Sequence, residues 1–215
     1  YIILDDYAGI QSLKQNFNFD NTEFYDQLSK KGFFVSSNSF SNYPFTILSI
    51  PSSLNMQYLN FNNSDKIENT KTLDGIRNIL DNNLVMKNLN ENGYHITSFF
   101  AGNEAIGNNN LVDEKICGEK YFSSHNLAKI YPEERLKEKR NEILCTFDQM
   151  VKVKDRISQP IFVYTHFSLP HEPFVLNENG DFQIFDETNL DYYEYKKAYI
   201  QQVEFANKMT TKVIN

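Results

Sequence analysis

The sequence predicts an α/β fold, in which a doubly wound, mainly parallel sheet carries helices on both faces. Short β-prone runs alternate with segments of helix length along the chain. The run at residues 1–5 is apolar up to its final aspartate, which is typical of a strand that is buried on both faces. The chain of 215 residues is long enough to build one core, and a single domain over residues 1–215 is expected.

The first elements follow from local signals. Residues 1–5 form the first expected strand, and Asn21 or Thr22 can cap a helix that reaches Lys31, because Gly32 follows as a stop. The aromatic run at residues 33–35 predicts the next strand.

A polar and aromatic loop is expected over residues 36–45, and a helix is expected from Thr46 onward. Pro51 must then lie in the first turn or two of that helix, because proline has no N–H group to donate. The Asn-rich residues 57–71 are expected to form a loop.

The middle of the chain predicts two helices and a strand. Helices are expected over residues 73–82, behind Thr72 as a cap, and over residues 84–91, which end near a glycine. Residues 94–100 are rich in β-formers and predict a strand, while residues 101–130 are expected to be irregular.

The last part of the chain continues the alternation. A helix is expected from Glu133 to about Lys152, and a strand is expected over residues 161–165 after Pro160. A polar loop from residue 166 to 187 and a helix over about 190–214 complete the predicted pattern.

The net charge and the cysteine count exclude some partners and metal sites. The formal charge of -7 argues against a nucleic-acid backbone as the main partner. It does not exclude a phosphate-bearing substrate, because a bound metal can supply positive charge locally. The chain has two cysteines, Cys117 and Cys145, which form no CxxC pair, and this count excludes a zinc site built from four cysteines. A disulfide between them and two buried free thiols both remain open.

Chemically active side chains follow three of the predicted strands. Asp5 and Asp6 end the first strand, Thr46 begins a helix after the expected strand at residues 33–35, and His166 and His171 follow the strand at residues 161–165. The carboxyl ends of parallel strands share one edge, so these side chains are expected to converge. Carboxylates are hard ligands for a divalent cation, and a metal can activate a hydroxyl as a nucleophile.

Each of these residues also has a purely structural interpretation. An aspartate at a strand end is often a turn residue, and a threonine at a helix start is often an N-cap. His171 lies in the run Pro170-His171-Glu172-Pro173 and could belong to a rigid turn. Asn42 is a candidate contact for a phosphate oxygen.

Four segments taken together resemble the alkaline phosphatase-like superfamily, which includes the sulfatases. The nearest branch is similar to the membrane-anchored sulfatase-like phosphotransferases, among them the lipoteichoic acid synthases. The segments lie in the order of the family between residues 1 and 174: YIILDDY, GFFVSSNSFSNYPFTILSIPSSLN, NGYHITSFF and IFVYTHFSLPHEPF.

The resemblance implies roles for particular residues. Asp5 matches the strand-end metal ligand, and Asp6 stands where sulfatases have a second acid and other branches have glycine. Thr46 matches the nucleophile, which also binds the metal. His171 matches the histidine on the substrate side, with His166 as a second candidate. The implied cofactor is a divalent cation: zinc, manganese, magnesium or calcium.

The residue at the nucleophile position favours one activity over another. Sulfatases carry there a cysteine or serine that becomes formylglycine, and Thr46 cannot undergo that conversion. The resemblance therefore implies a phosphoglycerol or phosphoethanolamine transferase, or a phosphodiesterase. The alternatives are a sulfuric ester hydrolase and an inactive binding or interaction domain of the same fold.

The family pattern also contains a late Asp-His pair, whereas no histidine follows His171 here. We therefore expect the chain to be an N-terminal fragment of the catalytic domain, cut at both ends, soluble by itself and weak in metal binding. The implied parent is a membrane-anchored protein whose catalytic domain lies outside the cytoplasm. Its expected substrates are phosphoesters or sulfate esters, such as a phospholipid head group or an envelope glycan.

Overall fold

A parallel sheet forms the centre of the molecule in a computed structural model that describes residues 1–59, 70–101, 109–117, 132–185 and 189–215. The strands of these residues are β1 (Ile2–Leu4), β2 (His95–Ala101), β3 (Glu114–Ile116) and β4 (Ile161–Phe167). They lie in the order β1-β4-β2-β3, and every neighbouring pair is parallel. The predicted α/β class is confirmed.

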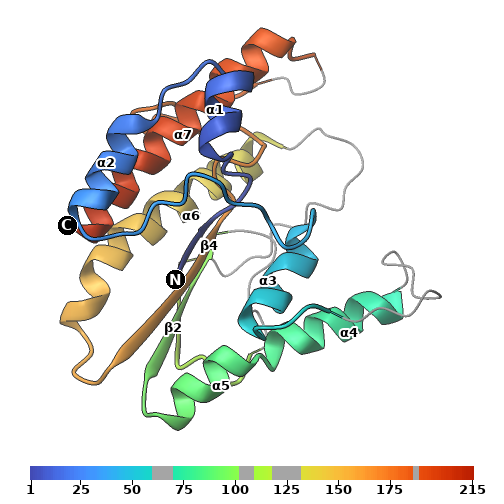
Figure 1. Ribbon diagram of the computed structural model, residues 1–215, viewed down its shortest axis with the longest axis vertical. Coiled ribbons are helices and arrows are strands. Elements are labelled where there is room, and N and C mark those ends of the chain that lie inside the picture. Colours follow the sequence, from blue (N-terminus) through green and yellow to red (C-terminus); the bar gives the residue numbers. More distant parts are fainter. Residues whose placement is uncertain (60–69, 102–108, 118–131, 186–188) are drawn as a thin grey trace.

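Helices cover both faces of the sheet (Figure 1). One layer contains α1 (Ile10–Asn16), α2 (Thr22–Lys30), α6 (Glu133–Lys152) and α7 (Tyr192–Ile214), with a short 3-10 turn at Val153–Asp155 after α6. The other layer contains α3 (Thr46–Leu54), α4 (Thr70–Asp81) and α5 (Leu84–Glu91).

Each layer has its own apolar core against the sheet. Phe147 of α6 stacks on Phe167 of β4 with ring centroids 4.2 Å apart, and Phe205 of α7 contacts Phe147 edge-on. On the opposite face, Ile50 and Met86 belong to a cluster with Tyr164 of β4. The central strands are therefore buried on both sides, as their apolar sequence requires.

Local signals account for several helix boundaries. Asn83 caps α5 by accepting a hydrogen bond from the backbone N–H of Met86 at 2.9 Å. Asp191 and Glu194 form a capping box at the start of α7. The predicted helices at residues 84–91 and 133–152 are confirmed at both ends, and Pro51 lies in the second turn of α3.

Four expectations about the elements are wrong. Thr72 does not cap its helix, because α4 already begins at Thr70. Residues 33–35 form no strand, and Phe33 and Phe34 are exposed, because no strand of the described residues pairs with them. His166 lies inside β4 and not in the following loop, since the strand continues to Phe167. Within the expected irregular stretch, Glu114–Ile116 forms β3 beside β2. Most of that stretch, and most of the expected Asn-rich loop, lie outside the described residues.

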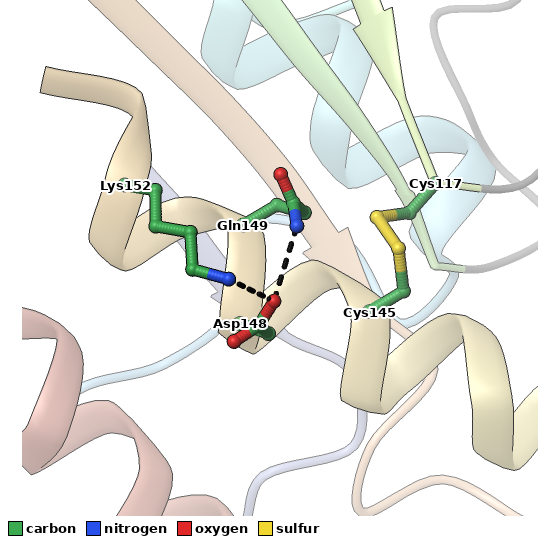
Figure 2. The surroundings of a disulfide bond; sticks show 5 residues. All are labelled: Cys117, Cys145, Asp148, Gln149 and Lys152. Carbon is green, nitrogen blue, oxygen red and sulfur yellow. Dashed lines mark hydrogen bonds and ion pairs between the residues drawn. A yellow bond between two sulfur atoms is a disulfide. The ribbon is translucent and has the colours of Figure 1, made fainter. Parts of the chain in front are cut away.

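A disulfide joins Cys117, directly after β3, to Cys145 on α6 (Figure 2). The two Cα atoms lie 5.8 Å apart, and this pairing decides between the two alternatives that the sequence leaves open. On the next turn of α6, Asp148 accepts hydrogen bonds from Gln149 and Lys152. Among the helices of the described residues, none is both long enough and apolar enough to cross a membrane.

Candidate active site

An open cleft of about 560 Å³ lies where β1 ends and α3 begins. Asp5, Asp6, Thr46 and His171 line it, together with aromatic residues that include Tyr43 and Phe45. The fold thus brings together four of the six candidate residues at the carboxyl edge of the sheet, where open α/β sheets bind ligands.

Asp5 is the centre of this group. Its backbone N–H donates to the carbonyl of Phe167 at 2.9 Å, which continues the pairing of β1 with β4. Its carboxylate accepts a hydrogen bond from Thr46 Oγ1 at 3.1 Å on Oδ1, and His166 Nε2 lies 3.6 Å from Oδ2. The side chain is 21% exposed, so one part of it remains open to a ligand.

The surroundings of Asp5 favour its charged form. Burial acts to raise the pKa of Asp5, but His166, His171 and the Thr46 hydrogen bond together outweigh it and lower the pKa. The carboxylate is therefore ionised at neutral pH and suited to bind a cation.

Asp6 has a different environment from its neighbour. Its backbone is in the left-handed region, with φ at 62°, a conformation that aspartate tolerates better than most residues. Tyr199 of α7 donates its hydroxyl to the Asp6 carbonyl at 2.8 Å and accepts the N–H of Ala8 at 2.9 Å. Burial raises the pKa of Asp6, and the nearby charge of Asp5 adds to this effect.

Thr46 is the first residue of α3, and Phe45 occupies the N-cap position. The Thr46 hydroxyl donates to Asp5 and so points toward the strand end. Asn42 does not line the cleft, because its side chain turns to Ser49: it accepts from the Ser49 hydroxyl and donates to the Ser49 carbonyl.

The two candidate histidines occupy different positions. His171 lines the cleft, and its backbone N–H donates to the Asp5 carbonyl at 3.1 Å. Its ring Nδ1 donates to the Glu172 carbonyl at 2.6 Å. His166 is only 3% exposed, and neither ring nitrogen has a hydrogen-bond partner among the described residues. His171 can therefore reach a substrate in the cleft, whereas His166 lies behind Asp5.

Sequence reasoning missed two buried polar residues beneath the loop that carries His171. Lys139 of α6 donates to the carbonyls of His171 and Pro173, both at 2.9 Å. Gln202 of α7 donates to the Pro170 carbonyl and accepts the N–H of Val175, both at 3.0 Å. The sequence of α6 could have indicated that Lys139 is buried, because this lysine lies within an apolar stripe at helical spacing: Leu136, Ile143, Phe147 and Met150.

The donors in the cleft fit part of the coordination shell of a divalent cation. The Asp5 carboxylate and the Thr46 hydroxyl are hard oxygen ligands only 3.1 Å apart, a combination that suits magnesium, manganese or calcium. Within the described ranges, no group of three or more His, Cys, Asp or Glu residues is arranged to hold a metal.

The family model described as Sulfatase matches residues 1–215. The chain belongs to the sulfatase family. Membership supports a hydrolase-like enzyme activity, and members of the family generally use divalent metal ions. No curated protein and no solved structure matches the chain.

Proposed function

We propose that this sulfatase-family protein is a metal-dependent enzyme that cleaves or transfers phosphoesters, with Thr46 as the nucleophile. The observation that carries the proposal is the hydrogen bond from Thr46 Oγ1 to Asp5 at 3.1 Å, at the start of α3 and on the wall of the cleft. A helix N-terminus favours negative charge, so it favours the Thr46 alkoxide and the phosphoryl oxygens together.

The proposed chemistry proceeds in two steps. In the first, Thr46 Oγ1 bonds to phosphorus as the bond between phosphorus and the leaving alcohol breaks, and the hydroxyl proton passes to Asp5 Oδ1. In the second, water or an acceptor alcohol bonds to phosphorus as the bond between phosphorus and Thr46 Oγ1 breaks, and Oγ1 takes its proton back from Asp5. A divalent cation held by Asp5 and Thr46 would lower the pKa of the hydroxyl and offset the charge of the phosphoryl group.

His171 is the proposed proton carrier of the cleft. Its Nδ1 is engaged by the Glu172 carbonyl, so Nε2 is the ring atom left to exchange a proton with substrate. As an imidazolium it would protonate the leaving alcohol in the first step, and as the neutral base it would take the proton of the incoming water or alcohol in the second.

A phosphoester is favoured over a sulfate ester by the residue at position 46, because threonine cannot become formylglycine. A phosphoglycerol or phosphoethanolamine transferase, or a phosphodiesterase, is the favoured type, and a phospholipid head group or an envelope glycan is the proposed natural substrate. A sulfuric ester hydrolase is the second candidate, and the match to the sulfatase family model supports it.

The test compares the full-length protein with Thr46→Ala and Thr46→Ser variants on three probes. These are bis-p-nitrophenyl phosphate, p-nitrophenyl phosphate and p-nitrocatechol sulfate, each with added magnesium, manganese or zinc. We expect the diester to be cleaved, and we expect Thr46→Ala to lower kcat by at least about a thousandfold. Thr46→Ser keeps a hydroxyl and should retain part of the activity.

Three results would decide against this assignment. Full activity of Thr46→Ala would show that another group attacks phosphorus. Cleavage of the sulfate ester alone would support the second candidate, and inertness toward all three probes with every metal would support a binding domain of the same fold.

We also propose that the domain works outside the cytoplasm in a membrane-anchored protein. The Cys117–Cys145 disulfide supports an oxidising compartment, since such bonds rarely persist in the cytosol. Thiol labelling of the protein, denatured directly from its native cells without reductant, should find both cysteines blocked. Two freely labelled cysteines would contradict the proposed location.

A further inference from the structure

The loop after β4, residues 168–176, has no helix or strand of its own but is largely buried. We call it the His171 loop. Leu169, Val175 and Leu176 are fully buried, and Phe174 is 2% exposed. A buried loop needs partners for its backbone groups, and the partners here come from α6 and α7.

Lys139 is the charged partner among them. It is only 3% exposed, and a buried ammonium is unfavourable unless acceptors surround it. Its Nζ donates to the carbonyls of His171 and Pro173, both at 2.9 Å. These carbonyls belong to the 171–172 and 173–174 peptide groups, so the ammonium holds the two peptide groups on either side of the one that contains the Glu172 carbonyl.

The Glu172 carbonyl determines which ring nitrogen of His171 carries the hydrogen. It lies 2.6 Å from Nδ1 of His171, and a carbonyl oxygen can only accept. Nδ1 must therefore carry the hydrogen, and in the neutral ring the lone pair is on Nε2.

We propose that Lys139 is a positioning residue for His171: by binding the carbonyls of residues 171 and 173, it orients the Glu172 carbonyl and holds the neutral ring in the Nδ1–H tautomer. Nε2 of His171 then offers a lone pair to the cleft. The inference rests on the proposed function only for the role of His171 as proton carrier. The tautomer itself is measured without turnover, so it can fail independently of the proposed function.

The measurement is long-range 1H–15N NMR of the histidine rings of the full-length protein at about pH 8. His171 is assigned by the loss of its signals in His171→Gln. The wild type should show His171 mainly as the Nδ1–H tautomer. Lys139→Met should lose that tautomer as the major form, because the Glu172 carbonyl is no longer held toward the ring.

Two variants separate positioning from general support of the helix. Lys137→Met removes an exposed lysine of the same helix, whose ion pair is with Glu133 at 2.5 Å, and it should leave the His171 signals unchanged. Lys139→Arg keeps a cation with several donors and should restore the Nδ1–H tautomer at least in part. The signals of His95, on β2, serve as an internal reference for the fold.

The proposal would be overturned by a wild-type His171 that is mainly the Nε2–H tautomer. It would equally be overturned by a folded Lys139→Met protein in which the Nδ1–H tautomer persists. If Lys139→Met does not fold, Lys139→Gln takes its place. The neutral amide of glutamine keeps hydrogen-bond donors, but it cannot bind both carbonyls as the charged ammonium does. An unchanged tautomer in that variant has the same consequence.

Discussion

Two walls of the cleft are built in opposite ways. The His171 loop, residues 168–176, is buried, and its backbone is held by Lys139 of α6 and Gln202 of α7. The Thr46 loop, residues 33–45, leads into α3 and is mostly exposed: Phe34 is 94% and Phe40 is 87% exposed. In the described part of the chain, its side-chain hydrogen bonds reach no farther than Leu59.

The difference shows that order at a catalytic edge does not require regular structure. The His171 loop is fixed because buried side chains from two helices take up its carbonyl and N–H groups. Thr46 is fixed instead by the helix that it starts and by one hydrogen bond, to Asp5. We therefore expect the His171 wall to control the stability of the domain, and the Thr46 wall to control only its chemistry.

The strongest test of this difference between the two loops makes the same substitution in both. Phe174→Ala removes a ring that is 2% exposed, and Phe34→Ala removes one that is 94% exposed. We expect the first to lower the free energy of unfolding by about 3 to 5 kcal/mol and the second to change it by less than about 0.5 kcal/mol. Urea unfolding followed by circular dichroism measures both. Similar losses in the two variants would mean that the walls are supported equally.

A smaller effect is expected from the support that α7 provides. Gln202→Leu leaves the Pro170 carbonyl and the Val175 N–H without their partner. We expect this to lower the free energy of unfolding by about 2 to 4 kcal/mol. Gln201→Leu is the matched control, because within the described residues Gln201 donates to the Glu178 carboxylate alone, and its free energy of unfolding should fall by less than about 1 kcal/mol. Hydrogen exchange of the Val175 amide should speed up in the first variant alone; protection that survives Gln202→Leu would assign the order of the loop to other contacts.

The smallest effect concerns the helix that carries Lys139. Burial, together with Glu138, raises the pKa of Glu142 on α6 to about 7. The folded state thus holds this proton more tightly than the unfolded state, so the contribution to stability is present at low pH and is lost as pH rises from about 4.5 to 7.

Glu142→Gln should remove this dependence. We expect the variant to be more stable than the wild type at pH 8 by about 1 kcal/mol, since solvent screens this partly exposed carboxyl, and to match it near pH 5. Urea unfolding at the two pH values tests the expectation. If the variant is no more stable than the wild type at pH 8, the ionised Glu142 does not destabilise the folded protein.

The strand-end acid, the helix that starts at Thr46 and the α/β class could all be predicted from the sequence, because each depends on local spacing. A run of apolar residues before Asp5 marks a buried strand wherever its partners lie, and a hydroxyl before an apolar helix marks the start of that helix. The expected strand at residues 33–35 was wrong because a strand depends on a partner elsewhere in the chain. Aromatic residues indicate that a strand is possible, but a strand needs a neighbour to pair with.

The sequence by itself determined which chemical groups are available: a carboxylate at a strand end, a hydroxyl at a helix start and two histidines near one strand. Only the tertiary structure decided which histidine faces the cleft, because β4 runs two residues past the predicted end, which buries His166 and leaves His171 beyond the strand. It also placed Lys139 beneath a loop that lies 32 residues away in the chain. Periodicity reveals the face on which a residue lies, whereas the partner of a buried polar group is set by how the elements pack.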